Sequence, residues 1–129
     1  MDLAAWLERL EQLHPSAIDL GLVRCGEVAR RLDLLDTAVT TITVAGTNGK
    51  GSTVAVMEAV LCARGERVGA FTSPHLVRYN ERIRVEGTEV ADAIIVEAFE
   101  AIDQARSDIS LTYFEFNTLA ALWIFKKLN

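Results

Sequence analysis

The strongest chemical pattern in this sequence is a glycine-rich run that contains a lysine, Gly46-Thr47-Asn48-Gly49-Lys50-Gly51-Ser52-Thr53. Three glycines within six residues allow positive φ angles and a close approach of the backbone to a ligand. Successive N–H groups at a helix N-terminus attract anions, and the Lys50 ammonium adds a mobile positive charge. A tight turn would need only one or two glycines. The run therefore predicts phosphate binding, with a hydroxyl of Ser52 or Thr53 available for a phosphate or a magnesium ion.

The run differs in two places from the strict phosphate-loop signature G-x-x-x-x-G-K-[ST]. Val44 stands where the first glycine is expected, and Gly51 separates Lys50 from Ser52. The lysine, together with the placement of the run between a predicted strand and a predicted helix, still favours a phosphate site over a simple turn.

A second polar segment, Thr72-Ser73-Pro74-His75, follows another short predicted strand. Ligands of α/β proteins bind at the carboxyl ends of the strands, which is where this segment lies. Ser73 is either a metal ligand or a capping residue, and His75 is either a catalytic group or part of a polar surface. The residue types alone favour capping and turn formation.

Two more residues allow a structural and a functional interpretation. His14 precedes Pro15, a pairing typical of a helix end. Glu115 is an acid within an otherwise apolar segment, so it is either the N-terminal charge of the last helix or a carboxylate of a binding site. The pattern of residues does not separate these alternatives.

The spacing of apolar residues predicts the elements that must position these groups. It predicts helices at 3–13, 22–35, 51–64, around 92–105 and around 116–124. Segments typical of strands lie at 40–45, 67–72 and 82–86. The order of strand 40–45, helix 51–64 and strand 67–72 predicts a right-handed βαβ unit with parallel strands. We therefore expect an α/β fold with a mainly parallel sheet flanked by helices.

Length and composition set the broad class of protein. A chain of 129 residues corresponds to one domain, and its 50% hydrophobic and 24% charged residues exclude a disordered chain. Thirteen basic and eighteen acidic side chains give a net charge of −5, which argues against nonspecific binding to nucleic acids or anionic membranes. The sequence has neither a signal-peptide pattern nor an apolar run of about 20 residues. We expect a cytoplasmic protein with Cys25 and Cys62 reduced.

Three longer segments are distinctive: the loop with its preceding strand at 42–53, the run Thr-Ser-Pro-His-Leu-Val-Arg-Tyr-Asn-Glu-Arg-Ile at 72–83, and the block Asp-Ile-Ser-Leu-Thr-Tyr-Phe-Glu-Phe at 108–116. Together they resemble the folylpolyglutamate synthases of the Mur ligase superfamily. The segment Ile-Asp-Leu-Gly-Leu at 18–22 is similar to the bifunctional dihydrofolate synthase/folylpolyglutamate synthase branch. The phosphate loop of this family carries the extra glycine, which accounts for the departure from the strict signature.

The resemblance implies a role for each matching residue. It implies that ATP phosphates are bound by Gly46, Thr47, Asn48, Gly49, Lys50, Gly51 and Ser52, with Lys50 as the catalytic residue, and that magnesium is bound by Ser73. It also implies that the pterin part of dihydropteroate is lined by Gln12, Leu13, His14, Pro15, Thr112, Tyr113, Phe114 and Glu115. A flat heteroaromatic ring stacked on Phe114, beside a carboxylate for its N–H groups, is chemically reasonable.

The implied reaction is the ATP-dependent addition of L-glutamate to dihydropteroate and then to reduced folates. ATP would phosphorylate the substrate carboxylate, and the glutamate amino group would displace phosphate from the resulting acyl phosphate. The implied cofactors are ATP and Mg²⁺. The implied partners are these small molecules, with no nucleic acid and no membrane, and we expect the full-length enzyme to be a monomer.

The resemblance also bears on the extent of the chain. Members of the family are much longer and have a second, C-terminal domain, and further metal-binding residues follow the point that matches Asn129. We therefore expect residues 1–129 to be the N-terminal part of the ATP-binding domain, without the C-terminal domain, and to be inactive alone. Two alternatives stay open at this point: a Mur-type ligase acting on a cell-wall precursor, and a non-catalytic ATP-binding module.

Overall fold

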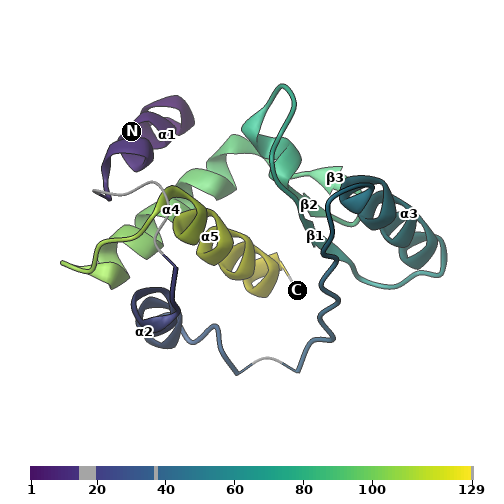
Figure 1. Ribbon diagram of the computed structural model, residues 1–129, viewed down its shortest axis with the longest axis horizontal. Coiled ribbons are helices and arrows are strands. Elements are labelled where there is room, and N and C mark those ends of the chain that lie inside the picture. The colour runs from purple at the N-terminus through teal and green to yellow at the C-terminus, as the bar shows by residue number, and fades with distance from the viewer. Residues whose placement is uncertain (15–19, 37, 129) are drawn as a thin grey trace. The chain divides into compact units, whose positions relative to one another are not determined.

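The computed structural model describes residues 1–14, 20–36 and 38–128. The chain forms two compact units, of which one comprises Met1–Thr37 with Asp92–Lys127 and the other Ala38–Ala91 with Leu128–Asn129. The first unit is helical, whereas the second combines a helix with a small sheet (Figure 1). Within the described ranges, no helix is both long enough and apolar enough to cross a membrane.

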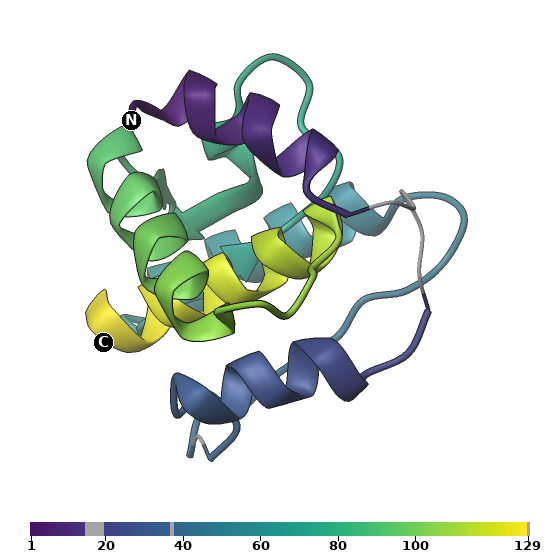
Figure 2. The same cartoon turned by 90° about the vertical axis from the view of Figure 1, so that its left-hand side faces the viewer.

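Four helices build the first unit, namely α1 (Leu3–Gln12), α2 (Val23–Arg31), α4 (Asp92–Arg106) and α5 (Tyr113–Leu128). Asp2 caps α1, because its carboxylate accepts a hydrogen bond from the Ala5 N–H at 2.9 Å. Both α1 and α2 pack against α4, and Figures 1 and 2 show them on opposite sides of the α4–α5 pair. The predicted helices are confirmed, but α2 is shorter than expected because Asp33 takes a left-handed φ of 56°.

Three aromatic side chains form the centre of this helical unit. Trp6 of α1 lies 5.9 Å from Phe99 of α4 and 6.4 Å from Phe116 of α5, measured between ring centroids. Phe99 and Phe116 meet edge to face at 5.7 Å, a geometry that aromatic pairs prefer. Both phenylalanines are fully buried. The apolar faces predicted from helical spacing in α1, α4 and α5 therefore converge on one core.

The second unit contains α3 (Lys50–Ala63), β1 (Gly69–Phe71), the short 3-10 helix η1 (Tyr79–Arg82), β2 (Ile83–Val85) and β3 (Thr88–Glu89). The three strands pair in the order β1-β2-β3, and both pairs are antiparallel. Glu86 and Gly87 connect β2 to β3 with φ angles of 52° and 79°, as a tight two-residue hairpin turn requires. An ion pair of 3.1 Å between Glu58 of α3 and Arg84 of β2 links the helix to the sheet.

One predicted strand, 40–45, is not formed in the part of the chain that the structure describes. A parallel strand of an α/β sheet is hydrogen-bonded to its neighbours and buried on both faces. Here Ile42 is 58% exposed, and β1 pairs with β2 instead. The expected parallel pairing of 40–45 with 67–72 is therefore wrong for the described residues, although the mixed helix-and-strand class and the helix between these segments are confirmed.

Candidate functional site

The glycine-rich run leads directly into α3, as its sequence predicts. Gly49 is the residue before the helix and has a left-handed φ of 74°, while Gly46 has a φ of 148°. Residues with a Cβ rarely adopt such angles, so both positions favour glycine. The Thr53 N–H and hydroxyl both donate to the Gly49 carbonyl, at 2.9 Å and 2.8 Å. The turn is thus held from within the helix, and of the two candidate hydroxyls that of Thr53 is already engaged.

The surroundings of this turn leave room for a ligand. All residues from 46 to 53 are exposed. A Cβ added at Gly49 or at Gly51 would meet no atom within 4 Å. The open turn lies at the N-terminus of a 14-residue helix, where unpaired N–H groups and the helix dipole attract anions. With the exposed Lys50 beside it, this geometry fits phosphate groups.

The loop that contains Ser73 is ordered by two residues further along the chain. The Arg82 Nε–H donates to His75 Nδ1 at 2.7 Å, and the Arg82 guanidinium lies 5.7 Å from the Tyr79 ring centroid. Because the arginine nitrogen is the donor, His75 Nδ1 is the acceptor and the ring proton of a neutral His75 lies on Nε2. Ser73 itself is exposed. The loop therefore presents a hydroxyl and an imidazole from a fixed backbone.

Glu81 holds the following part of the same loop. Its carboxylate accepts hydrogen bonds from the backbone N–H groups of Leu76, Val77 and Arg78, at 2.9, 2.9 and 2.7 Å. These three bonds favour the charged carboxylate and lower the pKa of Glu81 to about 2. Among the described residues, no group of three or more histidine, cysteine, aspartate or glutamate side chains is placed to hold a metal ion.

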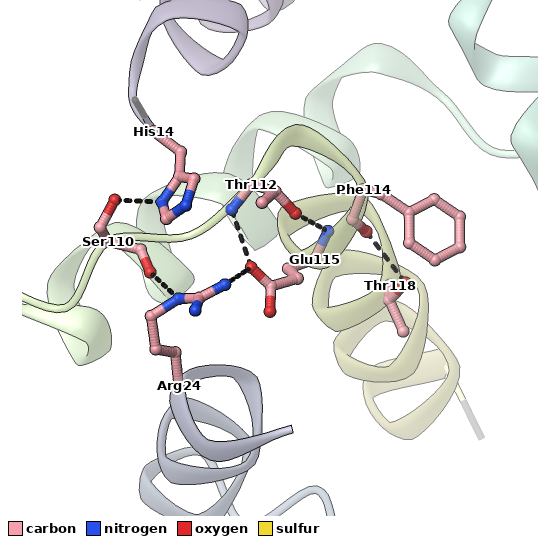
Figure 3. Close-up of polar contacts among 7 residues, drawn as sticks. All are labelled: His14, Arg24, Ser110, Thr112, Phe114, Glu115 and Thr118. Atoms are coloured by element: carbon pink, nitrogen blue, oxygen red, sulfur yellow. Dashed lines mark hydrogen bonds and ion pairs between the residues drawn. The ribbon is translucent and has the colours of Figure 1, made fainter. Parts of the chain in front are cut away.

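The start of α5 forms a capping box from Thr112 and Glu115 (Figure 3). The Thr112 hydroxyl accepts from the Glu115 N–H at 3.1 Å, and the Glu115 carboxylate accepts from the Thr112 N–H at 2.9 Å. Both side chains are buried. The pattern T-x-x-E before an apolar run is a sequence signature of this motif. Glu115 is therefore the N-terminal charge of the last helix, and this role leaves one carboxylate oxygen outside the box.

Arg24 of α2 joins this capping box to the segment that precedes it. Its Nη2 lies 2.8 Å from Glu115 Oε1, and its Nε donates to the Ser110 carbonyl at 3.0 Å. The Ser110 hydroxyl lies 2.6 Å from His14 Nδ1, just after the end of α1. Three segments that are distant in the sequence thus meet around residues 110–115, as Figure 3 shows.

The other residues predicted to line the pterin site differ in their exposure. Thr112 is buried in the capping box, Tyr113 and Leu13 are partly exposed, and Gln12 is exposed. Phe114 is 54% exposed, and in Figure 3 its ring points away from Arg24 and Glu115. Pro15 lies outside the described residues. The structure brings His14, Thr112 and Glu115 together, whereas it does not bring the Phe114 ring to the Glu115 carboxylate.

Two residues of this cluster, Arg24 and Ser110, were not predicted from the sequence. Arg24 is one of several charged residues on an amphipathic helix, and Ser110 lies in a short link. The capping-box pattern could have indicated such a partner, because a buried glutamate at the third helical position usually pairs with a cationic side chain. Which arginine supplies that partner depends on how α2 packs, which the sequence pattern does not give.

No protein-family model matches the chain. The chain is 54% identical over 125 residues to the dihydrofolate synthase/folylpolyglutamate synthase of Escherichia coli K12, which covers 97% of this chain and 30% of that protein. It is 50% identical over 125 residues to the Haemophilus influenzae protein of the same name, covering 97% of this chain and 28% of that protein. The chain thus spans about 30% of the length of these curated relatives.

Solved structures of enzymes from the same group are also similar to this chain. Escherichia coli FolC in complex with DHPP and ADP matches with a TM-score of 0.97 and 53% identity, over 100% of this chain and 31% of that one. The bifunctional enzyme from Yersinia pestis, complexed with AMPPNP and Mn ion, matches with a TM-score of 0.94 and 54% identity, over 100% of this chain and 32% of that one. At these identities the described fold is that of the matching part of these enzymes.

Proposed function

Since this chain belongs to the dihydrofolate synthase/folylpolyglutamate synthase family, we propose that it supplies the ATP-phosphate loop and part of the acceptor site of an ATP-dependent ligase. The ligase joins L-glutamate to dihydropteroate and to reduced folates. The observation that carries this proposal is the open glycine-rich turn with Lys50 at the N-terminus of α3. Residues 1–129 are the N-terminal part of the ATP-binding domain, and the C-terminal domain belongs to the rest of the ligase.

The phosphates of ATP bind to the turn formed by residues 46–52. The positive φ angles of Gly46 and Gly49 allow backbone N–H groups to approach phosphate oxygens closely. Lys50 is the catalytic residue of this chain, because its ammonium stabilises the charge on the phosphoryl group during transfer. The Ser52 hydroxyl provides a further contact at the exposed first turn of α3.

Within this chain, the Ser73 hydroxyl would hold Mg²⁺, and the further ligands of the ion would come from the nucleotide and from the rest of the complete protein. An uncharged oxygen is a suitable ligand for this hard cation, which usually keeps few protein ligands and several waters. Ser73 is exposed, and the Glu81 carboxylate keeps the following loop residues in place. When bound, the ion neutralises charge on the phosphates.

The substrate that receives glutamate, dihydropteroate or a reduced folate, binds near the start of α5; we call this place the acceptor site. Glu115 Oε2 accepts N–H groups of the pterin ring, because Oε1 is already used by Arg24 and Thr112. Phe114 is exposed and offers an aromatic face for a flat ring, but its ring points away from Glu115 (Figure 3), so stacking on a pterin bound to Oε2 requires this side chain to turn toward the carboxylate. The remaining contacts come from Gln12, Leu13, His14, Pro15, Thr112 and Tyr113.

The reaction has two steps in which atoms and charges balance. A carboxylate oxygen of the acceptor attacks the γ-phosphorus of ATP, the bond to the β-phosphate oxygen breaks, and ADP leaves. The glutamate nitrogen then attacks the carbonyl carbon of the acyl phosphate, loses a proton, and inorganic phosphate leaves as the amide forms. Within this chain, Lys50 and the backbone N–H groups of residues 46–52 stabilise the negative charge in the first step.

The enzyme acts on small molecules in the cytoplasm and works as a monomer, without binding nucleic acid or membrane. The net charge of −5 of residues 1–129 argues against nonspecific binding of this part to nucleic acids or anionic membranes, because such polyanions attract a positively charged surface.

Two binding measurements on the complete protein that carries this chain test the proposal. ATP–Mg²⁺ is titrated into this protein and into a Lys50→Ala variant, and we expect the variant to bind at least tenfold more weakly. Equal binding would remove Lys50 from the site. We also expect dihydropteroate, but not a UDP-muramyl peptide, to raise the melting temperature. Protection by the muramyl peptide alone would favour a cell-wall ligase, and protection by ATP alone a non-catalytic module.

A further inference from the structure

Glu115 is fixed by contacts from two directions. The Thr112 N–H at 2.9 Å and the Arg24 Nη2 at 2.8 Å both reach Oε1, as the dashed lines in Figure 3 show. The Glu115 side chain is 11% exposed and that of Arg24 is 27% exposed. An ion pair sheltered to this degree is screened less than a surface pair, so it holds the carboxylate in one orientation. That orientation leaves Oε2 as the oxygen that neither group occupies.

Arg24 is itself held, and this makes it a rigid support. Its Nε donates to the Ser110 carbonyl at 3.0 Å while its Nη2 reaches Glu115. Two acceptors on different nitrogens fix the plane of the guanidinium group, which a lysine ammonium with its single nitrogen does not reproduce. The same Ser110 binds His14 through its hydroxyl at 2.6 Å. Arg24 therefore belongs to one continuous set of contacts that runs from His14 to Glu115.

We propose that Arg24 is a positioning residue of the acceptor site: by holding Oε1 of Glu115 from the Ser110 side, it directs Oε2 toward the N–H groups of a flat heterocyclic ligand. This rests on the proposed function, which places Glu115 in the pterin site. Arg24 acts through Glu115 and does not touch the ligand. Its role is thus to set the affinity for the acceptor, independently of the nucleotide loop.

The test first compares three variants with the unsubstituted complete protein by their dissociation constants for dihydropteroate and for ATP–Mg²⁺. Arg24→Gln is expected to weaken dihydropteroate binding at least tenfold and to leave ATP binding within twofold. Arg24→Lys, which reaches one acceptor only, is expected to lie in between. The matched control is Arg30→Gln on the same helix, where an exposed arginine pairs with Glu27, and we expect no change beyond twofold.

A double-substitution cycle shows whether Arg24 works through Glu115. We expect Glu115→Gln and Arg24→Gln/Glu115→Gln to bind dihydropteroate equally weakly, because the arginine has nothing left to position. Independent losses that multiply would overturn the inference, as would dihydropteroate binding by Arg24→Gln within twofold of the unsubstituted protein. Equal weakening of ATP and dihydropteroate binding would show a general structural role and would also overturn it. Failure of the unsubstituted protein to bind dihydropteroate would overturn the proposed function and this inference together.

Discussion

The Glu115→Ala substitution should destabilise the helical unit more than any change to an exposed acid on the same unit. It removes the acceptor of a charge-assisted hydrogen bond of 2.8 Å from Arg24, which contributes about 1.5–3 kcal/mol when partly sheltered. It also removes the acceptor of the Thr112 N–H, a capping contact that contributes about 1 kcal/mol. The expected loss in the free energy of unfolding is therefore about 2.5–4 kcal/mol.

The assay is urea unfolding of the 129-residue chain, followed by tryptophan fluorescence. Both tryptophans of the chain, Trp6 in α1 and Trp123 in α5, lie in the helical unit and report on it directly. With a urea dependence of about 2 kcal/mol per molar for a chain of this size, the midpoint should fall by about 1–2 M. Glu100→Ala, at an exposed position of α4, is the control and should stay within about 0.5 kcal/mol.

A second pair of variants separates the capping bond from the ion pair. Thr112→Ala removes the acceptor of the Glu115 N–H and should cost about 1 kcal/mol, whereas Thr112→Ser keeps the hydroxyl and should cost less. If Glu115→Ala is no more destabilising than Glu100→Ala, the contacts at the start of α5 do not stabilise the unit and the reasoning fails.

Three further predictions concern the core, the Ser73 loop and the phosphate turn. Phe116→Ala removes the buried ring beside Trp6 and should lower the free energy of unfolding by about 3–5 kcal/mol, with a red shift of Trp6 emission. An unchanged midpoint of urea unfolding would contradict the packing of this aromatic cluster. The pKa of Glu81 is lowered from 4.5 to about 2, so the stabilisation by its charged carboxylate is complete above pH 4.5 and is lost as the pH falls through 2. NMR should show the amide signals of Leu76, Val77 and Arg78 titrating between these pH values. The Glu81→Gln variant should show no such titration. Gly49→Ala should cost about 1–2 kcal/mol because of the φ of 74°. Urea unfolding followed by circular dichroism is the measurement, because both tryptophans lie in the other unit, and equal stability would contradict this prediction.

Local patterns predicted most of the helices and the phosphate turn, because both depend on nearby residues. The spacing of Leu3, Trp6 and Leu10 gives one buried face of α1, and the structure buries all three. The three glycines of the 46–51 run allow positive φ angles, which Gly46 and Gly49 adopt, whereas Gly51 lies within α3. The Thr112-x-x-Glu115 pattern contained the capping box, although the sequence left the role of Glu115 open.

Features that depend on distant partners were not predictable in this way. The β-branched residues at 40–45 have strand propensity, but a strand forms only where a neighbour completes its hydrogen bonds, and β1 pairs with β2. Arg24 lies 91 residues before Glu115, and only the packing of α2 brings them together.

Release of inorganic phosphate by the complete protein that carries this chain tests the central claim most directly. With ATP–Mg²⁺ present, we predict release only when both dihydropteroate and L-glutamate are added, with the amide product formed in equal amount. Lys50→Ala should reduce this rate by about 100-fold or more, because it removes charge stabilisation at the transferred phosphoryl group. Release that does not need dihydropteroate and glutamate, or an unchanged rate in the Lys50→Ala variant, would contradict the account.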